Sequence, residues 1–147
     1  MKDNIRILVG VDGSNNSDRA LLEAVAIAKR FSGSIKVITV HGRGMEKKGK
    51  EIIEHAKFYL ENEVEYTTAV ILGSNPARAL RNMAEHENFD LVVVGSRGLS
   101  SKVSILRQFR WNGFNFVIRR IRNPLRFIPA DPWQFFGNIR IILFCYR

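Results

Sequence analysis

The segment that decides the fold reads Leu91-Val92-Val93-Val94-Gly95-Ser96-Arg97-Gly98-Leu99-Ser100-Ser101. Its first four residues are apolar and mostly β-branched, which predicts a strand buried on both faces of a sheet. Two glycines three positions apart follow, and glycine lets a backbone turn sharply and come close to a bulky anion. Arg97 between them can form two hydrogen bonds to a phosphate, and the serines stand where a helix N-terminus would favour an anion. The segment predicts either a phosphate-binding turn or a plain tight turn, because a lone Gly-x-x-Gly is a weak signal.

The rest of residues 1–100 alternates between strand-like and helix-like stretches. We expect strands at 5–11, 35–41, 64–72 and 91–94, the third of them near an edge of the sheet. We expect helices from an N-cap within 15–18 to about 31, over 50–63, and from 76 to 86–88. This alternation predicts an α/β domain with a doubly wound, mostly parallel sheet and helices on both of its faces.

The stretch 42–49 contains three glycines and is expected to be a loop. Gly42 and Gly44 suggest a dinucleotide-binding fingerprint, but Lys47 stands where the third glycine or alanine belongs, and we therefore reject it. The lysines that follow are interpreted as the solvated start of a helix.

Two loops are expected to meet at the carboxyl edge of this sheet. Ligands of doubly wound sheets bind there, at the point where the strand order reverses. If the first three strands wind to one side, the loop 11–14 faces the Gly95–Gly98 turn across one crevice. Asp12 would then accept hydrogen bonds from a sugar hydroxyl or hold a magnesium ion; the alternative is that it only caps the first helix. Backbone groups near His41 and Gly42 would reach the same crevice.

Several classes of protein are disfavoured by the residues present. The chain has no Gly-x-x-x-x-Gly-Lys-Ser/Thr, so it is not a P-loop NTPase, and its three histidines lie on different elements without metal-ligand spacing. No catalytic triad can be inferred from spacing.

The single Cys145 excludes an internal disulfide. Without a leader-like start or an apolar run of spanning length, we expect a soluble, cytoplasmic protein.

Four motifs, taken together, resemble the universal stress protein family. They are Ile7-Leu8-Val9-Gly10-Val11-Asp12-Gly13-Ser14, Val37-Ile38-Thr39-Val40-His41, Gly73-Ser74-Asn75-Pro76-Ala77, and the segment 91–101 quoted above. The resemblance covers roughly residues 4 to 101. It implies an α/β sandwich of five parallel strands, like that of adenine nucleotide alpha hydrolases, and usually a homodimer.

The resemblance also implies a ligand and the residues that hold it. In members that bind ATP, Asp12 and the loop beginning at Val11 would meet the ribose or adenine region, and Gly42 would touch adenine. The glycine turn would hold the phosphates through Gly95, Arg97 and Gly98, with Val94 beside the nucleotide and Mg²⁺ as an optional companion. We therefore predict a stress-response or signalling module that binds ATP or another adenine nucleotide. Since no general base can be named, it is not expected to be a dedicated enzyme.

One departure from the family pattern supports an alternative function. The family's ATP motif continues from the second glycine with nine residues and then Gly-Ser/Thr, but Gln108 and Phe109 stand at those two positions here. The alternative is a member that does not bind ATP and acts through protein partners.

Residues 102–147 differ in character from the body of the chain. Residues 1–100 hold fourteen basic and thirteen acidic residues, whereas residues 101–147 hold nine basic residues and one acidic, which accounts for most of the net charge of +9. Aromatic residues gather here too, and 138–144 is a candidate strand. Such a tail could bind nucleic acid or a membrane surface, although neither partner is expected. The abrupt change favours a third hypothesis, an out-of-frame version of the ordinary family ending.

Overall fold

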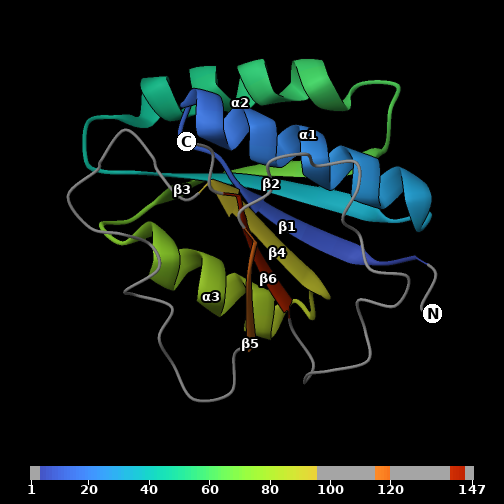
Figure 1. Ribbon diagram of the computed structural model, residues 1–147. Coiled ribbons are helices and arrows are strands. Elements are labelled where there is room, and N and C mark those ends of the chain that lie inside the picture. The colour runs from blue at the N-terminus through green and yellow to red at the C-terminus, as the bar shows by residue number, and fades with distance from the viewer. Residues whose placement is uncertain (1–3, 96–114, 120–139, 145–147) are drawn as a thin grey trace.

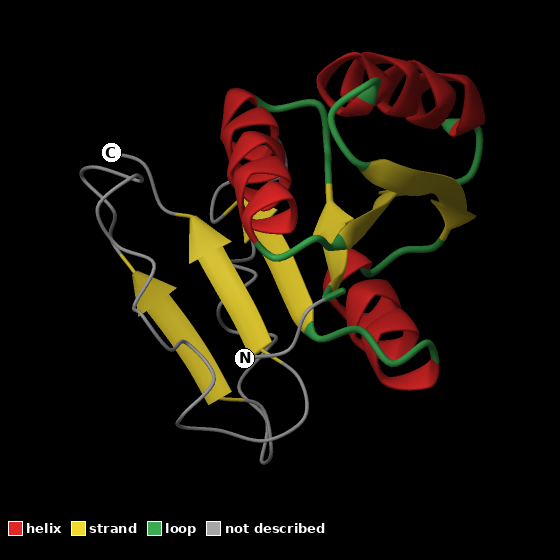
Figure 2. Ribbon diagram, turned by 90° about the vertical axis from the view of Figure 1, so that its right-hand side faces the viewer, coloured by secondary structure: helices red, strands yellow, loops and turns green. Residues whose placement is uncertain are grey.

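The computed structural model describes residues 4–95, 115–119 and 140–144. They form a parallel sheet with helices on both faces, as predicted (Figures 1 and 2). The elements in chain order are β1 (Arg6–Gly10), α1 (Asn15–Arg30), β2 (Ser34–His41), α2 (Glu46–Leu60), β3 (Glu65–Leu72), α3 (Pro76–His86), β4 (Leu91–Gly95), β5 (Asn115–Arg119) and β6 (Arg140–Phe144). None of the helices in these residues is long and apolar enough to cross a membrane.

The strand order is β3-β2-β1-β4-β6-β5, and all neighbouring strands are parallel. β2 and β3 lie on one side of β1 and β4 lies on the other, so the predicted reversal of strand order next to β1 is confirmed. Within the described residues the sheet has six strands, where five were expected. β6 falls within the candidate strand 138–144, whereas β5 was not predicted, although its Phe-Val-Ile centre is typical of a strand.

The helices cover the two faces of the sheet unequally. Figure 1 shows α1 and α2 on one face and α3 on the other. Ile7 and Val9 of β1 pack in the core beneath α1 and α2, whereas Leu8 packs in the core beneath α3. β1 and the fully buried β4 therefore form the centre of the molecule, as the apolar sequence of residues 91–94 predicts.

The prediction that residues 42–49 form a loop is wrong beyond Met45, because α2 begins at Glu46 and contains Gly49. Gly49 is buried, and a Cβ at this position would lie 2.9 Å from Val70 Cγ1 of β3. The glycine therefore allows close packing of the helix on the sheet. Lys47 and Lys48 are exposed near the helix start, as expected.

Candidate functional site

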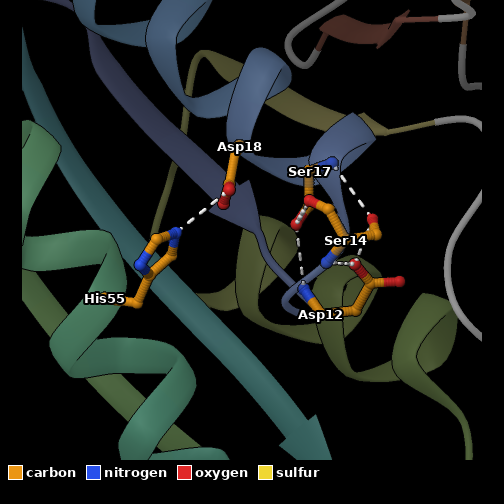
Figure 3. A network of polar contacts seen from close by, with 5 residues as sticks. All are labelled: Asp12, Ser14, Ser17, Asp18 and His55. Atoms are coloured by element: carbon orange, nitrogen blue, oxygen red, sulfur yellow. Dashed lines mark hydrogen bonds and ion pairs between the residues drawn. The ribbon is translucent and has the colours of Figure 1, made fainter.

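The turn after β1 is built around the Asp12 carboxylate (Figure 3). Asp12 Oδ1 accepts hydrogen bonds from the backbone N–H of Ser14 at 3.0 Å and from Ser14 Oγ at 2.6 Å. The other carboxylate oxygen points away from the turn in Figure 3. The two short contacts fix the orientation of Asp12 at the carboxyl end of the central strand.

Ser14 and Ser17 connect this turn to the start of α1. Ser14 is the N-cap, and its Oγ accepts a hydrogen bond from the Ser17 backbone N–H at 3.2 Å. Ser17 is buried; its hydroxyl donates to the Ser14 carbonyl at 2.9 Å and accepts from the Asp12 N–H at 3.4 Å. An N-cap within residues 15–18 was expected, so the cap lies one residue earlier. Asp12 supports the cap by orienting Ser14 but is not itself the cap residue.

Gly95, at the end of β4, lies against the first turn of α1. A Cβ at Gly95 would lie 3.0 Å from the Asn16 carbonyl carbon and 3.1 Å from the Ser17 backbone nitrogen. Such close contact with backbone leaves little room for a side chain, which explains why glycine stands here. The end of β4 and the Asp12 turn therefore both adjoin the start of α1.

Val11 directly follows β1, and Val94 lies next to the last residue of β4. Both are buried, Val11 in the core beneath α1 and α2 and Val94 in the core beneath α3. The Val11 N–H already donates to the Ile38 carbonyl at 2.9 Å.

Gly42 is placed farther from the end of β1 than the other predicted residues that the structure describes, which are Val11, Asp12, Val94 and Gly95. Gly10 pairs with both Ile38 and Val94, so the ends of β1 and β4 are level, whereas Gly42 lies four residues beyond Ile38. That separation is about 13 Å along an extended chain. Gly42 is exposed, and its carbonyl accepts from the Met45 N–H at 3.2 Å. The predicted residues Arg97 and Gly98 lie outside the described residues, as do Gln108 and Phe109.

A side-chain hydrogen bond between α1 and α2, beside the turn, was not predicted. His55 Nε2 of α2 lies 3.0 Å from Asp18 Oδ2 in the first turn of α1 (Figure 3). The His55 ring also packs edge-on against Tyr59. The contact with Asp18 joins the two helices on one face of the sheet. The partners are 37 positions apart in the sequence, so no local spacing signal could have revealed the contact.

The described part of the chain contains no group of three or more His, Cys, Asp and Glu side chains that could hold a metal ion. The site lies at the point where the strand order reverses. It offers one carboxylate, hydroxyls and backbone groups, which are suited to binding a polar ligand.

Comparison with known proteins agrees with this architecture. The model of the Universal stress protein family matches residues 4–107. Universal stress protein YxiE of Bacillus subtilis (strain 168) is 26% identical over 119 residues, which cover 65% of this chain and 80% of that protein. Among solved structures, protein Rv1636 of Mycobacterium tuberculosis H37Rv is 30% identical with a TM-score of 0.56, over 72% of this chain and 82% of that one. A universal stress protein in complex with cAMP is 27% identical with a TM-score of 0.59, over 69% and 80% of the two chains.

Proposed function

Because the chain belongs to the universal stress protein family, we propose that it is a binding or signalling module that binds an adenine nucleotide and is not a dedicated enzyme. The observation that carries this proposal is the position of Asp12. Its carboxylate is held at the end of β1 beside Gly95 of β4, where the strand order reverses. This is the place at which open α/β sheets bind their ligands.

The residues present fit an adenine nucleotide. A carboxylate oriented by Ser14 is a suitable acceptor for ribose hydroxyls. Gly95 brings the start of the glycine turn next to the N-terminal end of α1, where a phosphate is favoured. A magnesium ion that accompanied the phosphates would need only one or two protein carboxylates, and Asp12 could provide one. The relative in complex with cAMP supports a ligand of this class.

The proposal is tested by calorimetric titration of the full chain with Mg-ATP and, separately, with cAMP. Asp12→Ala is expected to weaken binding about tenfold to a hundredfold, because a hydrogen bond to a charged group contributes about 1.5–3 kcal/mol. Asp18→Asn is the matched control: Asp18 lies on the neighbouring turn, but its carboxylate faces His55. Its affinity is expected to equal that of the unmodified chain.

Equal loss in both variants would point to a general disturbance of α1 and would remove Asp12 from the site. Absence of binding by either nucleotide to the folded, unmodified chain would contradict the proposal. The second candidate, a member that acts through protein partners without ATP, would then be preferred. Gln108 and Phe109 at the positions of the family's Gly-Ser/Thr favour that candidate. A homodimer remains a prediction from the family resemblance, and a cytoplasmic location remains a prediction from the sequence.

A further inference from the structure

Two contacts show which side of α2 faces α1 and the turn after β1. A Cβ at Gly13 would lie 3.2 Å from Ile52 Cγ1. His55 Nε2 lies 3.0 Å from Asp18 Oδ2, and Figure 3 shows His55 pointing from α2 toward the start of α1. Ile52 and His55 are three positions apart, and residues three, four and seven positions apart share one side of a helix. This side of α2 therefore faces the Asp12 turn.

Lys48 lies on the same side of α2, four positions before Ile52. The helix begins at the carboxyl edge of the sheet, because it follows β2 and leads back to the parallel strand β3. Lys48 is therefore one helical turn closer to that edge than Ile52. Its neighbour Gly49 agrees with this level, since a Cβ there would lie 3.3 Å from Cδ2 of His41, the last residue of β2. The Lys48 side chain thus begins beside the Asp12 turn, at the edge where a ligand is expected.

The other lysines of α2 lie on other sides of the helix. Lys57 interacts electrostatically with Tyr66 of β3. Lys50, seven positions before Lys57, lies on the same side and therefore toward β3. Lys47 is exposed and is rotated by about 100° from Lys48, because an α-helix has 3.6 residues per turn. Lys48 is thus the one lysine of this helix on the side that faces α1.

No ion pair among the described residues accounts for Lys48. The ion pairs of α2 within those residues are Lys50–Glu46, Lys57–Glu54 and His55–Asp18. Lys48 also lies in the first turn of the helix, where the backbone dipoles disfavour a cation. Its side chain is exposed, and the flexible four-carbon stem of a lysine lets the ammonium group turn toward the carboxyl edge. A cation in this position is better suited to a ligand than to stabilising the helix.

We propose that Lys48 is a further binding residue of the candidate site and that its ammonium group contacts the phosphate attached to the ribose of the bound nucleotide. This inference rests on the proposed function, in which Asp12 accepts hydrogen bonds from the ribose hydroxyls. The phosphate attached to the ribose is the charged group nearest to those hydroxyls. Gly95 adjoins the Asp12 turn from β4, whereas Lys48 adjoins it from the side of β2. The site therefore takes a nucleoside phosphate in preference to the nucleoside itself.

A departure of the sequence from the family pattern gives such a lysine added weight. Gln108 and Phe109 stand where the phosphate motif of the family has Gly-Ser/Thr, and phenylalanine has no hydroxyl to donate. A lysine ammonium group carries a full charge and three N–H donors. Lys48 thus offers a phosphate hydrogen-bond donors from α2 in a chain that lacks the hydroxyl of the family motif.

Calorimetric titration of the full chain with AMP and, separately, with adenosine isolates this contact, because the two ligands differ by one phosphate. Lys48→Ala is expected to weaken AMP binding about tenfold, since it removes a hydrogen bond between charged groups. The same variant should bind adenosine as the unmodified chain does. Lys47→Ala is the matched control: it removes an exposed lysine from the same helical turn and should change neither affinity. Lys48→Arg keeps the charge and should bind AMP more tightly than Lys48→Ala.

The outcomes separate this inference from the proposed function. If the unmodified chain binds AMP and Lys48→Ala binds it equally well, the inference is wrong and the proposed function stands. An equal loss of affinity for AMP and adenosine would give Lys48 a structural role and would also overturn the inference. Binding of Mg-ATP without binding of AMP would show that the phosphate next to the ribose is not recognised. Absence of binding by all three ligands to the folded, unmodified chain would end both proposals.

Salt dependence gives a second readout of the same contact. An exposed ionic contact is screened by salt, so the ratio of AMP affinities between the unmodified chain and Lys48→Ala should fall as the salt concentration rises. The corresponding ratio for Lys47→Ala should stay near one at every salt concentration. A Lys48→Ala ratio that does not change with salt would contradict an ionic contact with the phosphate.

Discussion

Gly33 lies in the turn before β2. Within this turn, it is the residue at which an added Cβ should lower the free energy of unfolding the most. A Cβ at this position would lie 2.6 Å from the Ile5 carbonyl oxygen, which also accepts a hydrogen bond from the Ser34 N–H at 2.9 Å. Backbone atoms cannot move aside as a flexible side chain can. We expect Gly33→Ala to lower the free energy of unfolding by about 1–3 kcal/mol, measured by urea denaturation.

Gly42→Ala is the matched control for that substitution. A Cβ at Gly42 would meet no atom within 4 Å, so the free energy of unfolding should change by less than about 0.5 kcal/mol. If both variants had the same urea midpoint as the unmodified chain, the result would contradict the close approach of Gly33 to Ile5.

At the scale of residues, the sequence located Asp12 but could not decide its role. A carboxylate two residues before a serine fits both a ligand-binding loop and a helix start, because the same hydrogen bonds to Ser14 serve both. The structure shows that Asp12 supports the helix cap through Ser14. It also lies at the carboxyl end of β1, where the strand order reverses. His55 was expected to be only solvated, and its partner Asp18 comes from a distant helix that spacing cannot indicate.

In α1, Glu23 is partly buried among the apolar residues of the helix. Desolvation by this burial raises the pKa of the Glu23 carboxyl above its usual range. The folded state therefore binds a proton more readily than the unfolded state, and the ionised carboxylate destabilises the fold at a pH above its raised pKa. This cost disappears as the pH falls through that pKa.

Glu23→Gln is expected to raise the urea midpoint at pH 7, because the amide carries no charge to desolvate. The gain should shrink toward zero at acid pH, where the original carboxyl is protonated in both the folded and the unfolded state. Glu51→Gln, on the exposed face of α2, is the control and should leave the midpoint at pH 7 unchanged. A gain for Glu23→Gln that is the same at pH 7 and pH 4 would exclude desolvation of the charge as its cause.

The helices and strands could be predicted well where the apolar pattern of the sequence is regular. Their bounds were predicted less well where packing between distant residues determines them. β4, β3 and the start of α3 at Pro76 were placed within a residue or two, because β-branched runs and an N-terminal proline are strong local signals. The start of α2 was placed four residues late because Gly49 looked like a loop residue. Its role in bringing helix and sheet together depends on Val70, which lies 21 positions later in the chain.

At the scale of the molecule, β6 gives β4 its second neighbour. β4 is fully buried and pairs with β6 from Leu91 to Gly95. A chain that ends at residue 101 would lose this partner and expose an apolar strand edge. We expect it to aggregate, with a much lower soluble fraction by light scattering, whereas a chain that ends at residue 144 retains β6 and should remain as soluble as the full chain. Equal solubility of the two truncated chains would show that β4 needs no cover from β6.

The central position of β1 has a consequence for the time at which the protein can fold. β1 leaves the ribosome before the strands that flank it, β2 and β4, and Arg6 exchanges hydrogen bonds with Asp90, 84 residues later. At about 5–20 residues per second, roughly 4–17 seconds of synthesis separate the two. Throughout that interval the apolar β1 has an open side, so chaperone binding to the nascent chain should be strongest before β4 emerges.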